Sequence, residues 1–354
     1  MIKLEVKIEE KSNSYPIFID CNLSNLKSEI FDFINGKNCI FVISEKVYNL
    51  YGKILDLKKE TVFILKDGEN QKNFKNYKRI IDFCFNKKLT RDDFIVALGG
   101  GVVGDIAGFV ASTYMRGLNF IQVPTTLLAC VDSSVGGKTA INSPFGKNLI
   151  GSFYQPNAVF IYTDFLKTLD IRNFKSGLGE VVKYAFIEKS CCFEEDFNLI
   201  NFLETNNKKI IEKDTYTLSE LIKICILLKI SVVQKDEKES GLRRILNFGH
   251  TYGHAIEKIT KYKKYTHGEC VIEGIYFAFD LALKNNLIDK NYMFFMQDIL
   301  KKFDFKKVQK FKLDKIMPIM KMDKKASSDF VRFILPTDYS TVKEFRVNDL
   351  LTIF

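Results

Sequence analysis

The sequence of 354 residues has no tryptophan, only six prolines and only three histidines. It contains no run of about 18 uncharged apolar residues, which excludes a membrane-spanning helix. Its first residues, Met1 to Glu5, alternate charge and hydrophobe, so we expect no signal peptide. No segment is rich in proline, glycine and serine, so we expect the domains to pack closely rather than hang on a flexible linker.

Cysteine pairs with metal-binding spacing are also missing. None of the eight cysteines forms a CxxC pair, which argues against a cysteine zinc site. Without a secretory signal, we expect reduced and mostly buried thiols in a cytoplasmic protein.

The charge balance excludes one further class. Lysine and arginine number 53 and aspartate and glutamate 43, a net charge of +10. No lysine or arginine block and no RNA-binding aromatic motif accompanies this charge, so we expect no nucleic-acid partner. A basic balance is compatible with a site for an acidic small molecule.

What the sequence does have is a large apolar fraction, 46%, in a chain long enough for two domains. In the first half, short apolar runs alternate with amphipathic segments, a pattern typical of a parallel, doubly wound sheet. We predict strands over 2–8, 15–19, 38–43, 61–65, 93–98, 119–124 and 158–161, with helices over 73–85 and 105–112 among the segments between them.

The pattern changes near residue 170, after which long helical periodicity replaces the strands. Helices are predicted over 176–187, 217–234, 251–258 and 268–284, with a weak strand near 330–334. We therefore predict an α/β protein, with an N-terminal Rossmann-like parallel-sheet domain over residues 1–170 and a C-terminal, mostly α-helical domain over residues 171–354.

A glycine cluster follows one predicted strand and opens a helix. Gly99, Gly101 and Gly104 satisfy the G-x-G-x-x-G pattern, which lets a backbone approach a pyrophosphate at a helix N-terminus. The alternative is a tight turn that needs glycine for positive φ. No acidic residue follows about 20 positions on, so this is not the usual first Rossmann turn.

A second glycine cluster, 136–139, ends like a Walker A loop. The first glycine of that loop would stand at position 132, which is Asp132, so a P-loop is excluded. Asp132, Lys138, Lys147 and Asn148 nevertheless form a group rich in anion-binding residue types, unless they belong to a solvated loop.

All three histidines fall between His250 and His267. His250 and His254 are spaced i, i+4 and share one face of a helix. Imidazoles with a carboxylate make a catalytic zinc set with an open position. Three histidines, or two histidines and a carboxylate with the third histidine free for proton transfer, both fit this pattern. The candidate carboxylates are Glu180, Glu257 and Glu269.

Taken together, these motifs resemble the 3-dehydroquinate synthase family of sugar-phosphate cyclases, whose fold is similar to that of the glycerol and iron-dependent alcohol dehydrogenases. The resemblance extends from about residue 67 to 335. It is carried by segments 68–72, 99–105, 114–117, 124–129, 131–139, 146–151, 179–183, 242–254 and 267–269.

The resemblance implies an enzyme that converts 3-deoxy-D-arabino-heptulosonate 7-phosphate into 3-dehydroquinate and phosphate, in the shikimate pathway to chorismate and aromatic amino acids. It implies a site between the two domains, NAD that is reduced and regenerated within one turnover, a divalent metal ion (Zn2+ or Co2+), and a homodimer.

The resemblance also implies residue roles. Glu180, His250 and His267 match the metal ligands, and His254 matches a proton-transfer residue. Arg116 matches a residue that reaches the neighbouring subunit's site. Positions matching NAD contacts are Glu69, Lys72, Gly99, Gly100, Gly101, Gly104, Asp105, Thr125, Thr126, Lys138, Lys147 and Thr168. Positions matching substrate contacts are Asp132, Lys138, Asn148, Lys183, Lys229, Arg243, Asn247 and either Lys324 or Lys325.

Two departures from the family pattern stand out: Asp170 occupies a position where proline is common, and Ser44-Glu45 ends the second nucleotide strand. The main alternative is another sugar-phosphate cyclase acting on a neutral sugar phosphate. Lys229, Arg243 and Asn247 argue for a substrate with a carboxylate instead. A plain polyol dehydrogenase would have no use for the polar groups at 132–138 and 147–148.

Overall fold

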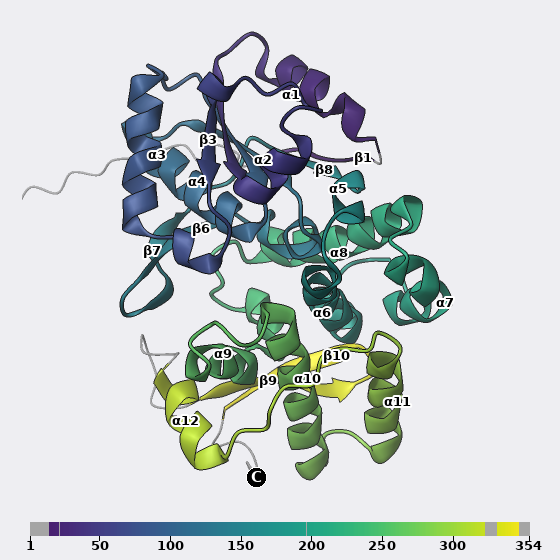
Figure 1. Cartoon of the computed structure of the whole chain (residues 1–354). Coiled ribbons are helices and arrows are strands. Elements are labelled where there is room, and N and C mark those ends of the chain that lie inside the picture. The colour runs from purple at the N-terminus through teal and green to yellow at the C-terminus, as the bar shows by residue number, and fades with distance from the viewer. Residues whose placement is uncertain (1–13, 21, 196, 323–330, 347–354) are drawn as a thin grey trace, which may run out of the picture.

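The structure is a computed structural model that describes residues 14–20, 22–195, 197–322 and 331–346 (Figure 1). A sheet flanked by helices forms one part, at the top of Figure 1, and a mostly helical part lies below it. Within the described residues, no helix is long and apolar enough to cross a membrane.

The sheet has six parallel strands in the order β1-β8-β5-β4-β2-β3. Every residue of β4 and β8 is buried, as expected for parallel strands covered on both faces. The strands are β1 (Ile17–Asp20), β2 (Cys39–Ser44), β3 (Val62–Leu65), β4 (Phe94–Gly99), β5 (Asn119–Pro124) and β8 (Ala158–Tyr162).

Alternate residues of each strand enter different cores, because successive side chains point to opposite faces. In β2, Ile40 and Val42 pack with one core, whereas Phe41 and Ile43 pack with the other. Helices α3 and α4 cover the first face, and α1, α2 and α5 cover the second. These helices are α1 (Leu26–Ile34), α2 (Glu45–Tyr51), α3 (Phe74–Asn86), α4 (Gly101–Thr113) and α5 (Asp164–Lys167).

An antiparallel hairpin, β6 (Lys138–Ser143) and β7 (Gly146–Phe153), leaves the sheet and lies against α4. Gly136 and Gly137 form the turn into it with φ of 93° and 68°, values that favour glycine. The sequence analysis predicted no strand over this segment. Every residue of β7 is partly or fully exposed, so its apolar pattern is weak.

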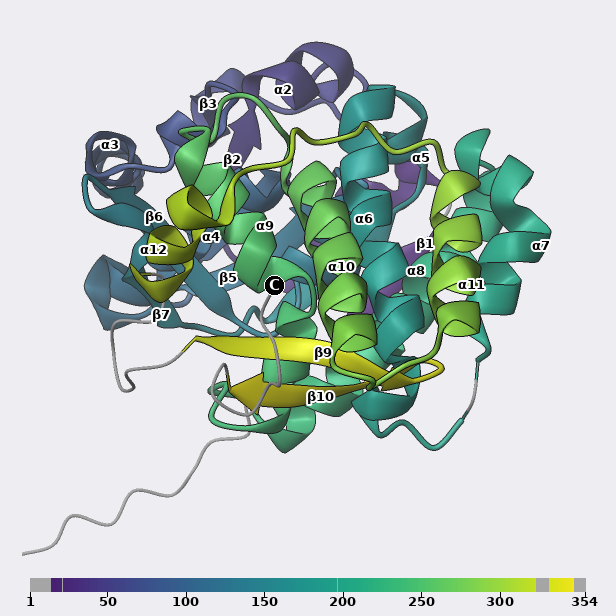
Figure 2. The same ribbon diagram turned by 90° about the horizontal axis from the view of Figure 1, so that it is seen from below.

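The helical part surrounds a third core, continuous with residues after β5. Helix α10 contacts α6, α9 and β9, and Figure 2 shows it between α6 and α9. The elements are α6 (Ile171–Ile187), α7 (Leu199–Ile211), α8 (Thr215–Lys235), α9 (His250–Ile259), α10 (His267–Lys284), α11 (Lys290–Lys301), α12 (Leu313–Met322), β9 (Arg332–Asp338) and β10 (Thr341–Arg346).

The predicted α/β class and the predicted strands from 38 to 161 are confirmed. Helix α4 begins at Gly101, not at residue 105, because the glycine turn itself forms the first helical turn. Strand β1 pairs in parallel with β8. The other predicted early strand, 2–8, lies outside the described residues, and the division at 170/171 remains a prediction.

Candidate active site

Three helices bring the proposed metal ligands together. Glu180 lies inside α6, His250 is the first residue of α9, and His267 is the first residue of α10. Thr266 caps α10, where its side chain and that of Glu269 form a reciprocal capping box. The capping box fixes the backbone at His267, whereas α9 begins at His250 after Gly249, whose φ is 77°.

Glycines beside the ligands allow these helices to touch. A Cβ atom on Gly268 would lie 2.0 Å from the carbonyl oxygen of Ser176, and one on Gly274 would lie 1.8 Å from that of Gly249. A Cβ atom on Gly179 would lie 2.9 Å from Gly268 Cα. Since real side chains do not tolerate such distances, glycine is needed for α6, α9 and α10 to approach this closely.

The approach places the ligand atoms of Glu180, His250 and His267 within 4.8 Å of one another. Glu180 Oε1 lies 3.3 Å from His250 Nε2 and 3.2 Å from His267 Nε2. The Glu180 side chain has no exposed surface, and neither of its oxygens has a hydrogen-bond partner among the described residues. Oε2 pairs with the Lys183 ammonium, whereas Oε1 faces the two imidazole nitrogens, and a divalent metal ion fits this set of donor atoms.

In each of the two imidazoles, the nitrogen that faces away from Glu180, Nδ1, has a partner of its own. His250 Nδ1 lies 2.9 Å from the carbonyl oxygen of Phe248, and His267 Nδ1 lies 3.5 Å from Glu257 Oε2. A proton on Nδ1 leaves the Nε2 lone pair facing Glu180, the tautomer that a metal ligand requires.

The electrostatics of the cluster favour positive charge. Burial lowers the pKa of His267, but Glu257 and Glu180 outweigh it and raise this pKa to about 10. Burial raises the pKa of Glu180, whereas Lys183 and His250 bring it well below its usual range. At neutral pH His267 therefore carries a second proton, on the Nε2 that faces the ionised Glu180, and a metal ion would bind here by displacing that proton.

The third histidine, His254, and the candidate carboxylate Glu269 have different surroundings. His254 lies beside the cluster, with its ring centroid 5.2 Å from that of His250 and 6.0 Å from that of His267. Glu269 binds Arg172 at 2.9 and 3.0 Å and completes the capping box of α10. Of the three candidate carboxylates, Glu180 is therefore the one in the cluster with His250 and His267.

A second group of charges surrounds Asp132. Lys229 Nζ lies 2.6 Å from Asp132 Oδ1, Tyr184 donates to the same oxygen at 3.1 Å, and Lys183 pairs with Glu180. Burial lowers the pKa of Lys229 to about 8, although Asp132 opposes this shift. Two buried lysines lie next to Glu180, His250 and His267, and their positive charges suit a negatively charged substrate group.

Lys138, Arg243 and Asn247 meet near a carboxylate that the sequence analysis missed. Glu239 pairs with Lys138 and accepts a hydrogen bond from Asn247 Nδ2 at 2.6 Å. Arg243 donates to the carbonyl oxygens of Glu237 and of Gly136, the latter at 3.0 Å. In the sequence, the run of charged residues at 236–239 before Arg243 was the only sign of this carboxylate. The partner of Glu239, Lys138, is 101 residues away along the chain.

The glycines of the turn at 99–104 are needed because neighbouring atoms leave no room for a side chain, and not because the backbone has positive φ. The glycines with positive φ do not include Gly99, Gly100, Gly101 or Gly104, so the alternative based on positive φ is wrong. A Cβ on Gly100 would lie 3.0 Å from Thr126, and one on Gly104 would lie 2.6 Å from Gln122 Oε1. The turn thus packs α4 tightly against β5 and leaves the helix N-terminus to face an anion.

Beside this turn, Lys72 joins three of the predicted cofactor and substrate residues. Its Nζ lies 2.7 Å from Asp105, 3.3 Å from Glu69 and 2.5 Å from Asn148 Oδ1. Lys72 is 3% exposed, and Asn142 Nδ2 donates to Glu69 at 2.7 Å. The hairpin and the glycine turn therefore share one polar network.

The remaining predicted residues are more scattered. Thr125 donates its N–H to Gly99, Thr126 accepts from Ala129, and the Thr168 hydroxyl lies 2.7 Å from that of Tyr51. Arg116 is exposed on the 3₁₀ turn Tyr114–Arg116, at the end of α4 away from the glycine turn. Lys324 and Lys325 lie outside the described residues.

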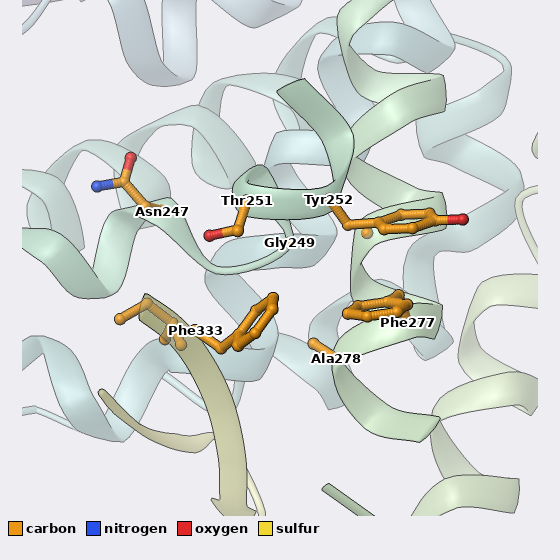
Figure 3. Close-up of a pocket in the computed structure, with 9 residues that line it drawn as sticks. Asn247, Gly249, Thr251, Tyr252, Phe277, Ala278 and Phe333 are labelled. Carbon is orange, nitrogen blue, oxygen red and sulfur yellow. The ribbon is translucent and has the colours of Figure 1, made fainter. Parts of the chain in front are cut away.

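A small cavity lies behind the histidine helix. Figure 3 shows Tyr252 of α9, Phe277 of α10 and Phe333 of β9 along it, with the Tyr252 and Phe277 rings stacked at 4.3 Å. Its lining does not include Glu180, His250 or His267. We read it as part of the support of α9, not as the substrate site.

Comparisons with known proteins show the family of this chain. The family model for the 3-dehydroquinate synthase N-terminal region matches residues 62–176, and the model for the C-terminal region matches 177–326. The 3-dehydroquinate synthase of Dictyoglomus thermophilum is 42% identical over 340 residues, covering 96% of this chain and 93% of that protein. The one of Prochlorococcus marinus subsp. pastoris is 40% identical over 360 residues, covering 99% and 97%.

Solved structures agree at the level of the fold. A 2-deoxy-scyllo-inosose synthase complexed with carbaglucose-6-phosphate, NAD+ and Co2+ has a TM-score of 0.80 and 27% identity, covering 95% of this chain and 92% of that one. The 2-epi-5-epi-valiolone synthase of Streptomyces hygroscopicus subsp. jinggangensis has a TM-score of 0.87 at 22% identity, covering 99% and 96%, which shows the fold alone. By its motifs and by these matches over nearly the whole chain, this protein belongs to the 3-dehydroquinate synthase family.

Proposed function

We propose that this chain is a 3-dehydroquinate synthase, a carbon–oxygen lyase that uses NAD and a divalent metal ion, Zn2+ or Co2+. Its substrate is 3-deoxy-D-arabino-heptulosonate 7-phosphate and its products are 3-dehydroquinate and phosphate. The observation that carries the proposal is the meeting of Glu180, His250 and His267 beside the buried lysines around Asp132.

Glu180, His250 and His267 would hold the metal ion. The ion, when bound, polarises a substrate hydroxyl and lowers its pKa, which favours removal of its proton. The chain's own contribution is orientation: the carbonyl oxygen of Phe248, 2.9 Å from His250 Nδ1, holds this imidazole with Nε2 toward Glu180.

The turn at Gly99 to Gly104 and the network around Lys72 would hold NAD. The cofactor supplies a reversible hydride acceptor, so no net NADH is formed. Helix α4 has no side-chain cap at Gly100, so the N–H groups at its start can face the pyrophosphate. Thr125, Thr126, Lys147 and Thr168 complete the proposed cofactor contacts.

The substrate carries a carboxylate and a phosphate, and the proposed site offers cations for both. Lys138 lies on the hairpin strand β6, Lys183 lies on α6 and Lys229 on α8. Arg243 has a planar guanidinium suited to a carboxylate. Buried Arg243 Nε has no hydrogen-bond partner among the described residues. Asn148, Asn247 and a lysine at 324 or 325 are the further proposed contacts.

Loss of phosphate requires a proton to leave one carbon and another to be delivered later. His254 is the proposed proton-transfer residue because it is half-buried and its ring lies beside that of His250. Closure of the ring then depends on holding the open-chain intermediate in one conformation, which a site lined by fixed charges favours.

We propose that the enzyme is a homodimer, with Arg116 reaching the site of the neighbouring subunit. Its exposed position at the end of α4, with φ of 69°, supports a role outside its own site. We propose a cytoplasmic location, which is supported by the seven described cysteines being free thiols.

Substrate choice tests this function against the other sugar-phosphate cyclases. Purified enzyme with NAD and Zn2+ should release phosphate from the heptulosonate phosphate and not from a neutral heptulose phosphate. Arg243→Ala should weaken substrate binding far more than NAD binding. Preference for the neutral sugar phosphate, or equal loss of both ligands in the variant, would move the chain to another branch of the family.

A further inference from the structure

One buried carboxylate next to the proposed metal ligands has no role in the function proposed above. Glu257 is 6% exposed and lies on α9, on the same helix as His250 and His254. Its Oε2 lies 3.5 Å from His267 Nδ1, and its Oε1 lies 3.4 Å from Lys147 Nζ. Each oxygen therefore has its own partner, one on α10 and one on β7.

We propose that Glu257 is a positioning residue that orients His267 for metal binding and strengthens it as a ligand. We further propose that Lys147 limits this effect by sharing the charge of Glu257. The inference rests on the proposed function, because it concerns the metal ion that Glu180, His250 and His267 would hold.

The geometry of the His267 ring carries the first part. The two ring nitrogens lie on different sides of the imidazole, and Nε2 is the one near Glu180, at 3.2 Å. An Nδ1–H group directed at Glu257 excludes the other tautomer and prevents the ring from turning over. A carboxylate partner on the outer nitrogen also makes the inner nitrogen more basic, so it binds a cation more tightly.

A comparison within the site supports this reading. The outer nitrogen of His250 has a neutral partner, the carbonyl oxygen of Phe248 at 2.9 Å, whereas that of His267 has a charged one. Hydrogen bonds to charged groups are roughly twice as strong as neutral ones. His267 should therefore depend more on its outer partner than His250 does.

Lys147 carries the second part. Its ammonium lies between Glu257 and the ring of Tyr262, 4.1 Å from the ring centroid. A positive charge on one oxygen of Glu257 withdraws electron density from the other, which faces His267. Removing Lys147 should therefore leave the metal as tightly bound as before, or more tightly.

The alternative is that Glu257 is itself a ligand. Together with His254 and His267 it forms a second group whose ligand atoms lie within 4.8 Å of one another. In that case the chain would hold two metal ions, and His267 would bind a different one through each nitrogen. Counting zinc per chain separates this alternative from a positioning role.

The test is the zinc affinity of the full chain, measured by competition with a chromogenic chelator, with zinc per chain counted by elemental analysis. Glu257→Gln keeps the shape of the side chain and should weaken zinc binding by about 10- to 100-fold. Lys147→Met should bind zinc at least as tightly as the wild type. Glu269→Gln is the matched control, because Glu269 is equally buried on α10 but binds Arg172, and its zinc affinity should not change.

Several results would overturn the inference. These are unchanged zinc affinity in Glu257→Gln, weaker affinity in Lys147→Met, an equal loss in Glu269→Gln, or two zinc ions per wild-type chain. Failure of Glu257→Gln to fold would leave Lys147→Met to decide. A wild-type chain that binds no zinc would contradict the proposed function itself, which is a distinguishable outcome.

Discussion

At the scale of single residues, the site is a set of groups whose charges depend on one another. Glu180 faces two imidazoles on one oxygen and Lys183 on the other, and Asp132 is paired with Lys229. Because these groups are buried, loss of one leaves its partner without compensation. The ligands and the neighbouring histidine should therefore respond differently to substitution.

We predict that His250→Ala loses bound metal and activity together, since one of three ligands is gone. His254→Ala should keep its metal and lose about 10²- to 10⁴-fold in kcat, the usual contribution of a general acid or base. Metal content by elemental analysis alongside turnover separates the two. A His254→Ala enzyme that lacks metal, or a fully active His250→Ala enzyme without metal, would refute the assignment.

A pH dependence follows from Lys229. Burial lowers its pKa to about 8, so this lysine is a cation below that pH and loses its charge above it. If it binds the substrate carboxylate, KM should rise as the pH passes 8. Lys229→Arg stays charged throughout and should flatten this rise. A wild-type KM that is constant across pH 7 to 9, or a variant with the same rise, would argue against Lys229 as the binding cation.

Much at this scale could be read from the sequence. Three histidines in 18 residues and a glutamate in an apolar helix predicted a metal site, and the family resemblance chose its members. The structure brings Glu180, His250 and His267 together. The partners of Glu239 and Glu257 could not be predicted, because Lys138 and Lys147 come from a hairpin more than 100 residues away.

At the scale of elements, glycine contacts decide where the ligands lie. Helices α6, α9 and α10 meet backbone to backbone at Gly179, Gly268 and Gly274. Their periodicity was readable, because each has an apolar face. Their crossing points were not, since a glycine in a helix gives no local sign of which helix will pack against it.

Gly274→Ala tests this arrangement. Its added methyl group would meet the Gly249 carbonyl at 1.8 Å, so α9 and α10 must separate. We expect a loss of about 1–3 kcal/mol in unfolding free energy by denaturant titration, with weaker zinc binding. Asp280→Ala, on an exposed position of the same helix, should change stability by less than about 0.5 kcal/mol. Unchanged stability and zinc affinity in Gly274→Ala would show that the close contact is not needed.

Strands show the same limit. Buried strands such as β4 were predicted from continuous apolar runs, whereas β7 was missed because its residues are partly or fully exposed.

Asp170, a departure from the family pattern, is explained by its local contacts. It caps α6 by accepting from Asn173 N at 3.0 Å and pairs with Lys46 of α2 at 3.2 Å.

At the scale of the whole molecule, polar contacts join the sheet part to the helical part around the site. Lys138 reaches Glu239, Arg243 reaches Gly136, and Lys147 reaches Glu257. The family resemblance implied a site between two domains, but the pairs that join the two parts were visible only in three dimensions.

The proposed homodimer gives a prediction at this scale. Arg116→Ala and His250→Ala should each be nearly inactive alone. In a mixed dimer, the site on the Arg116→Ala chain has all its own ligands and receives Arg116 from its partner. Unfolding and refolding an equal mixture should therefore restore about a quarter of wild-type activity, since half of the dimers are mixed and each has one complete site. No recovery would contradict the role of Arg116 across subunits.

The central claim is that one site oxidises, eliminates and reduces without net use of NAD. The most direct measurement is phosphate release from the heptulosonate phosphate with NAD and Zn2+, with and without a chelator, while NADH absorbance is followed. The account predicts phosphate release that the chelator abolishes and added zinc restores, with no accumulation of NADH. Steady NADH accumulation, or phosphate release that the chelator leaves unchanged, would contradict it.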